Sequence, residues 1–128
     1  MAEPRPSNRP LSPHLSVYRW QMNSVMSIFH RMTGIGMAFT GILLVWWFFA
    51  AAISPGYFAF VDALLTSWLG KLVLVVSLVA FWYHFLNGVR HLHWDTAKGL
   101  GLSQSARTGW YAIVGAVLLT ALSLWMTM

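Results

Sequence analysis

The chain has 128 residues, of which 58% are hydrophobic and 9% are charged, whereas an average soluble domain carries about 25% charged residues. A soluble protein of this size must expose a large share of its residues, so the composition argues against a soluble domain and favours lipid as the solvent. The net charge of +5 comes from cations that flank apolar segments, which argues against nucleic-acid binding, and the absence of cysteine excludes disulfides, thiolate-bound iron–sulfur clusters and a covalently attached haem within this chain.

The N-terminal segment, residues 1–22, is predicted to lie in the cytoplasm. It contains Arg5, Arg9 and Arg19 but no apolar core, so it does not have the pattern of a secretory signal peptide. Its prolines would break the amphipathic helix of a mitochondrial transit peptide. We therefore expect a bacterial inner (cytoplasmic) membrane in preference to the mitochondrial inner membrane.

Residues 23–128 are predicted to form an all-α integral membrane domain with three spanning helices. A helix needs roughly 20 apolar residues to cross about 30 Å of hydrocarbon, and three stretches reach that length. The expected spans are about 26–53, 71–93 and 106–127. Ala112, Ala116 and Thr120 fall on one face of the third span, where small residues allow close helix packing.

The connection between the first two spans is predicted to contain a short helix. Ser54, Pro55 and Gly56 provide strong turn chemistry after the first span. Apolar side chains then recur at helical spacing within residues 57–70, at Phe58, Val61, Leu65 and Trp68. This pattern predicts a helix over residues 57–70 that lies in the membrane interface.

The distribution of Lys and Arg predicts the orientation of the spans. Seven cations belong either to the N-terminal segment through Arg31 or to the second loop and the span ends that flank it: Arg5, Arg9, Arg19, Arg31, Arg90, Lys98 and Arg107. The first loop holds one, Lys71, and the end of the chain holds none. Because cytoplasmic segments carry the excess of Lys and Arg, we expect the N-terminus inside and the C-terminus outside.

His84 is the ionisable residue that lies deepest in a predicted span. It precedes Arg90 by six residues, which places it about 9 Å inside the membrane boundary at 1.5 Å per residue. An ionisable group at that depth needs a partner. A neutral imidazole there suits haem ligation, a hydrogen bond to a neighbouring helix, or proton relay. His91 shares the His84 face, so the second ligand of a bis-histidine haem would come from another chain.

Two further polar clusters lie near the predicted inner boundary. Ser27 and Arg31 are four residues apart and share one helical face, so they could donate hydrogen bonds to a quinone carbonyl. His30 and Arg31 could instead contact haem propionates. The simpler alternative, which Arg31 taken alone favours, is that its side chain only reaches lipid headgroups.

The second of these clusters follows His84 along the chain. Arg90 and His91 suit contacts with haem propionates or lipid headgroups, and Asp95 could take up protons from the cytoplasm. Gly88, one turn after His84, leaves room for a flat ring against the helix. The alternative is an interfacial helix end that simply carries polar groups.

Three segments together resemble a known family. Residues 9–15 (RPLSPHL), residues 27–34 (SIFHRMTG), and His84 followed by residues 88–91 (GVRH) and Asp95 occur in this order. They resemble the cytochrome b-type membrane anchor of succinate dehydrogenase, respiratory complex II, over nearly the whole chain. The resemblance implies a helix bundle formed with a second small anchor subunit, beside an iron–sulfur subunit and a flavoprotein subunit.

The resemblance also implies roles for individual residues. His84 would be one axial ligand of haem b, and the partner anchor would supply the other. Ser27 and Arg31 would help to bind ubiquinone, and His30 and Arg31 would lie near the haem propionates. The chain would carry electrons from the iron–sulfur subunit to ubiquinone at the inner face of the membrane, as part of an enzyme without a complete active site of its own.

Two other functions compete with this interpretation. A haem-free anchor of the fumarate reductase type would keep the quinone site, but it has no need of an imidazole as deep as His84. A small transporter or channel subunit would need a polar path through the whole membrane, whereas the outer halves of these spans carry almost no ionisable groups.

Overall fold

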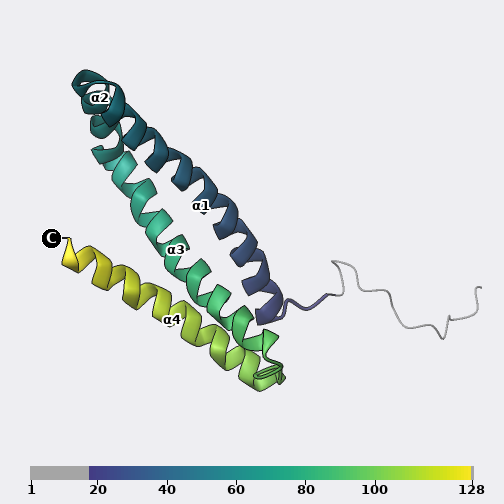
Figure 1. Cartoon of the computed structure of the whole chain (residues 1–128). Helices are drawn as coiled ribbons and strands as arrows, with labels where there is room; N and C mark the ends of the chain where they lie inside the picture. The colour runs from purple at the N-terminus through teal and green to yellow at the C-terminus, as the bar shows by residue number, and fades with distance from the viewer. Residues whose placement is uncertain (1–17, 128) are drawn as a thin grey trace, which may run out of the picture.

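The computed structural model describes residues 18–127, and these residues form four α-helices (Figure 1). The helices are α1 (Met22–Ile53), α2 (Pro55–Thr66), α3 (Trp68–Asp95) and α4 (Leu102–Met126). By length and composition, α1, α3 and α4 are each able to cross a membrane. The prediction of an all-α chain with three spanning helices is therefore confirmed for the described residues.

The three long helices extend beyond the apolar stretches that predicted them. α1 begins at Met22 and α4 begins at Leu102, so each helix includes several polar residues ahead of its apolar stretch. α3 continues to Asp95, after which Ala97 and Gly99 adopt positive φ angles of 59° and 73° and reverse the chain. Hydropathy marks the part of a helix that suits lipid, whereas backbone hydrogen bonding continues until a turn interrupts it.

The predicted helix over residues 57–70 is wrong in its extent. α2 ends at Thr66, Ser67 has extended backbone angles (φ −58°, ψ 162°), and Trp68 already belongs to α3. The Ser67 hydroxyl accepts a hydrogen bond from the Gly70 amide at 3.1 Å and so caps α3. A break of one residue leaves the apolar spacing almost unchanged, which is why periodicity did not reveal it.

A small apolar core fixes α2 against α1. Ala50, Val61 and Leu65 are buried there, and two tryptophans of α1 close the core with polar contacts. Trp46 donates from Nε1 to the hydroxyl of Tyr57 at 2.7 Å, and Trp47 donates from Nε1 to Oδ1 of Asp62 at 3.1 Å. The corner between α1 and α3 is therefore held by side chains as well as by caps.

The small-residue face predicted on the third span is a packing face. Ala112, Ala116 and Thr120 of α4 are buried, and Trp82 of α3 donates to the Ser123 hydroxyl at 3.1 Å. α4 packs on the C-terminal part of α3 and diverges from α3 and α1 as it proceeds toward the C-terminus (Figure 1). The starts of α1 and α4 and the end of α3 consequently gather at one end of the molecule, which we call the junction end.

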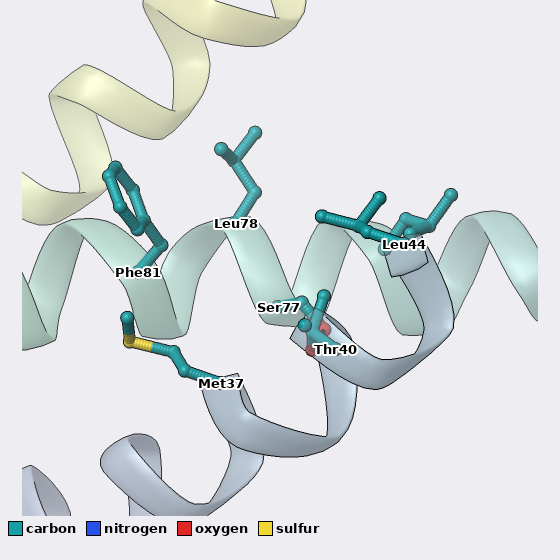
Figure 2. A pocket seen from close by; sticks show the side chains of 8 residues that line it. Met37, Thr40, Leu44, Ser77, Leu78 and Phe81 are labelled. Carbon is teal, nitrogen blue, oxygen red and sulfur yellow. Dashed lines mark hydrogen bonds between the residues drawn. The ribbon is translucent and has the colours of Figure 1, made fainter. Parts of the chain in front are cut away.

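Hydroxyl groups join α1 and α3 between the junction end and the α2 corner. Thr40 donates from Oγ1 to the Ser77 hydroxyl at 2.7 Å, and Ser77 donates to the Val73 carbonyl at 2.8 Å. Figure 2 shows this pair among Met37, Leu44, Leu78 and Phe81, which line an apolar groove of about 310 Å³ between the two helices. Polar contacts of this kind hold helices together where lipid surrounds them.

Most large apolar side chains of the long helices are exposed rather than buried. On α1 these include Ile35, Phe39, Val45 and Phe48. A surface of this size and chemistry needs lipid or partner helices around it.

Candidate functional site

Histidine rings from α1 and α3 meet near the junction end. The rings of His30 and His84 stack with centroids 3.9 Å apart and an interplanar angle of 12°. The ring of His91 lies 5.3 Å from that of His30. The sequence places His84 and His91 on one helical face, but only the docking of α1 on α3 brings His30 between them.

The hydrogen bonds of His84 determine which ring nitrogen carries the proton. Nδ1 lies 3.0 Å from the His30 carbonyl oxygen and 3.2 Å from Oγ1 of Thr33. A carbonyl oxygen can only accept, so Nδ1 is the donor, and the neutral ring presents an unprotonated Nε2. No hydrogen bond within residues 18–127 occupies Nε2. This arrangement is the one that metal-binding histidines adopt, with the second nitrogen held by a carbonyl group.

Two glycines shape the space around His84. A Cβ atom on Gly34 would lie 3.0 Å from Cε1 and 3.9 Å from Nε2 of His84, so the absence of a side chain there allows the ring to sit close to α1. A Cβ atom on Gly88 would meet nothing within 4 Å. The α3 surface one turn after His84 is therefore open, as expected for a helix that receives a flat ring.

His30 carries an unpartnered polar atom. Its Nδ1 is buried and has no hydrogen-bond partner among the described residues. Buried polar atoms are nearly always paired, and an orphan is evidence for a ligand, an ion or a partner that completes it. Together, the available Nε2 of His84 and the orphan Nδ1 of His30 fit a site that a cofactor completes.

Arg90 lies apart from the histidines, inside the helix junction. It is 6% exposed and donates from Nη2 to Oδ1 of Asn23 at 2.8 Å and to the Ser105 carbonyl at 2.7 Å. Its Nε donates to the Thr108 hydroxyl at 3.1 Å, and its Cζ lies 4.0 Å from the ring centroid of Trp94. The guanidinium thus ties α1, α3 and α4 together. We assign Arg90 to helix packing and propose no propionate contact for it.

Ser27 and Arg31 line a pocket at the start of α1. The pocket has a volume of about 470 Å³, and its other lining residues are Tyr18, Trp20, Asn23, Ser24 and Ile28. Ser27 is half-buried, and the Arg31 side chain is exposed at this pocket. The predicted sharing of one face by this pair agrees with their common pocket.

Asp95 is exposed at the end of α3, four residues after His91, and so lies at the junction end. Residues 9–15 lie outside the described residues.

Sequence analysis missed two residues that support the site. Thr33 contacts His84, and the hydroxyl of Tyr83 donates to the Met26 carbonyl at 3.0 Å across the α1–α3 interface. Thr33 lies one turn after His30 and next to Gly34, and this position in the sequence could have indicated that Thr33 belongs to the site. The sequence does not say which α3 residue faces Thr33, so the contact with His84 could not be predicted.

Comparison with known proteins places the chain among respiratory membrane subunits. The family model described as "Succinate dehydrogenase/Fumarate reductase transmembrane subunit" matches residues 5–123. The chain is 44% identical over 124 residues to the succinate dehydrogenase cytochrome b556 subunit of Paracoccus denitrificans, covering 97% of this chain and 95% of the relative. It is 40% identical to the corresponding Rickettsia felis subunit, covering 93% and 92%. The mitochondrial cytochrome b560 subunit of Mus musculus is 41% identical, covering 88% of this chain and 68% of the relative.

Proposed function

Because this chain belongs to the succinate dehydrogenase/fumarate reductase transmembrane subunit family, we propose that it is the haem b-containing anchor of a succinate:ubiquinone oxidoreductase. It passes electrons from an iron–sulfur subunit to ubiquinone at the inner face of the membrane. A flavoprotein subunit oxidises succinate, and a second small anchor subunit completes the membrane bundle. The observation that carries the proposal is the His84 ring, with Nδ1 held by a carbonyl oxygen and Nε2 available.

The residues around His84 fit haem b. His84 would hold the iron through Nε2, and a histidine of the second anchor would supply the other ligand, because His91 lies on the same helical face as His84. The rings of His30 and His91 lie beside this site, Arg31 follows His30 on α1, and the three side chains would suit the propionates, with the orphan Nδ1 of His30 as one donor or acceptor. Haem bound there supplies a reversible one-electron store.

Ser27 and Arg31 serve the quinone. Reduction of a quinone to a quinol takes two electrons and two protons, and negative charge develops on the quinone oxygens as electrons arrive. The Arg31 cation stabilises that charge strongly where water is scarce, and the Ser27 hydroxyl orients the carbonyl. Tyr18 and Trp20 give the same pocket an aromatic wall that suits a flat ring.

Asp95 supplies protons from the aqueous side. Its carboxylate is exposed at the end of α3, and His91 lies one turn earlier on the same face. This position allows proton uptake from the cytoplasm at the end of the bundle where the proposed quinone pocket also lies. With the excess of cations at the same end, we place the N-terminus inside and the C-terminus outside a bacterial inner membrane.

A reduced-minus-oxidised spectrum of the purified complex tests the proposal. A b-type band, together with co-isolation of a flavoprotein and an iron–sulfur protein, is the expected result. A complex that reduces quinone without a b-type band would establish the haem-free anchor instead. Isolation of the chain without redox partners would support a transporter or channel subunit and overturn the proposal.

A further inference from the structure

The side chain of Thr33 contacts the ring of His84 from the neighbouring helix. Oγ1 of Thr33 lies 3.2 Å from Nδ1 of His84, 2.8 Å from the Phe29 carbonyl oxygen and 2.9 Å from the His30 carbonyl oxygen. We propose that Thr33 is a positioning residue for haem binding, which fixes the rotation and the basicity of the His84 imidazole. The inference rests on the proposed role of His84 as a haem ligand.

The single hydrogen of the Thr33 hydroxyl decides whether Thr33 donates a hydrogen bond to His84 or accepts one from it. Thr33 has one hydroxyl hydrogen, and both carbonyl oxygens of its own helix are acceptors within reach. When that hydrogen points to a carbonyl, a lone pair of Oγ1 faces the Nδ1–H of His84. Thr33 is therefore an acceptor toward His84, beside the His30 carbonyl oxygen at 3.0 Å.

Two acceptors hold the ring more firmly than one. A single carbonyl oxygen leaves the imidazole free to rock about its Cβ–Cγ bond, whereas a second acceptor on the same helix restricts that rotation. The flat contact with His30 and the close approach of Gly34 confine the ring further. The direction of Nε2, which decides whether iron can be bound, follows from these contacts.

Acceptance from Nδ1–H also changes the electronic character of the ligand. A hydrogen bond at this nitrogen increases electron donation from the other nitrogen to a metal, which favours the ferric state. Loss of the Thr33 acceptor should therefore raise the midpoint potential of haem b. Outer-shell substitutions of this kind commonly weaken metal binding by roughly 10- to 100-fold.

The experiment compares Thr33→Val, Thr33→Ala and Thr33→Ser in the assembled complex with its other subunits. Thr33→Val removes the hydroxyl at nearly constant size, Thr33→Ala does so without added bulk, and Thr33→Ser restores it. Thr40→Val is the matched control, because Thr40 lies on the same helix and donates to Ser77 of α3 without contacting His84. The measurements are the haem-to-flavin ratio under limiting haem supply, the midpoint potential and the low-spin electron paramagnetic resonance signal.

We expect Thr33→Val and Thr33→Ala to lower the haem-to-flavin ratio several-fold, to raise the midpoint potential and to shift the resonance signal. Thr33→Ser and Thr40→Val should match the wild type. If both hydroxyl-free variants keep wild-type haem content, potential and resonance signal, or if Thr40→Val shows the same changes, Thr33 has no positioning role. The ligand role of His84 fails separately, if the wild-type complex contains no haem b or if His84→Leu keeps its spectrum.

Discussion

His30 and His84 stack across the α1–α3 interface, with their ring centroids 3.9 Å apart and their planes within 12° of parallel. The contact joins residues that are 54 positions apart in the chain. Because the carbonyl of His30 also accepts from Nδ1 of His84 at 3.0 Å, one residue of α1 holds the ring by both its backbone and its side chain. The site is consequently a property of the helix pair rather than of either helix alone.

Substitution of His84 by leucine should abolish the b-type absorption or shift it strongly. Leucine offers no nitrogen to iron, so the haem proposed here would lose the ligand that this chain provides. The reduced-minus-oxidised spectrum of membranes with equal flavoprotein content measures the effect. His93→Leu is the control, because His93 packs beside Gly99 rather than in the His84 cluster. An unchanged spectrum in His84→Leu would move the ligand role to another residue.

Substitution of Arg31 by leucine should lower quinone reduction by about 100-fold, the usual effect of losing one donor that stabilises developing charge. Succinate oxidation with an artificial soluble acceptor should change little, because that route does not use the Ser27 and Arg31 pocket. The two assays on the same membranes give the comparison, and Arg107→Leu removes an arginine of α4 as the control. Equal losses in both assays would show that Arg31 has a structural role.

Substitution of Arg90 by methionine should make the complex more sensitive to heat. It removes the donors that satisfy Asn23, Ser105 and Thr108, and hydrogen bonds to a charged group contribute about 1.5–3 kcal/mol each. Arg90→Lys should rescue only in part, because an ammonium group cannot match the planar fork. Thermal inactivation measures the effect. The haem midpoint potential below the inactivation temperature should stay at the wild-type value, and a shift would instead support a propionate contact.

Substitution of Gly34 by alanine should disturb haem binding, because the new Cβ would lie 3.0 Å from Cε1 of His84. Such a distance is too short for an undisturbed contact, so either the ring turns or α1 moves away from α3. Gly36→Ala is the matched control, since a Cβ atom there would meet nothing within 4 Å. We expect a changed haem spectrum in the first variant and a normal one in the second. Normal spectra in both would show that the ring tolerates displacement.

The sequence alone determined the features that depend on local composition. Apolar runs long enough to cross a membrane predicted the three long helices, and the small residues at Ala112, Ala116 and Thr120 predicted a packing face. The depth of His84 identified it as a candidate ligand without any knowledge of its neighbours. The motifs that resemble the family lie in contiguous segments, so they too were accessible to sequence reasoning.

Only the tertiary structure decided which side chains meet. Periodicity identifies the apolar and polar faces of each helix, but not how the helix is rotated or shifted against its neighbour. The stack of His30 on His84 and the contact of Thr33 with His84 could therefore not be predicted. The same reason explains Arg90, which shares a polar segment with His91 yet turns into the junction of α1, α3 and α4. A polar residue near a membrane boundary takes its role from the partner within reach, and that partner lies on another helix.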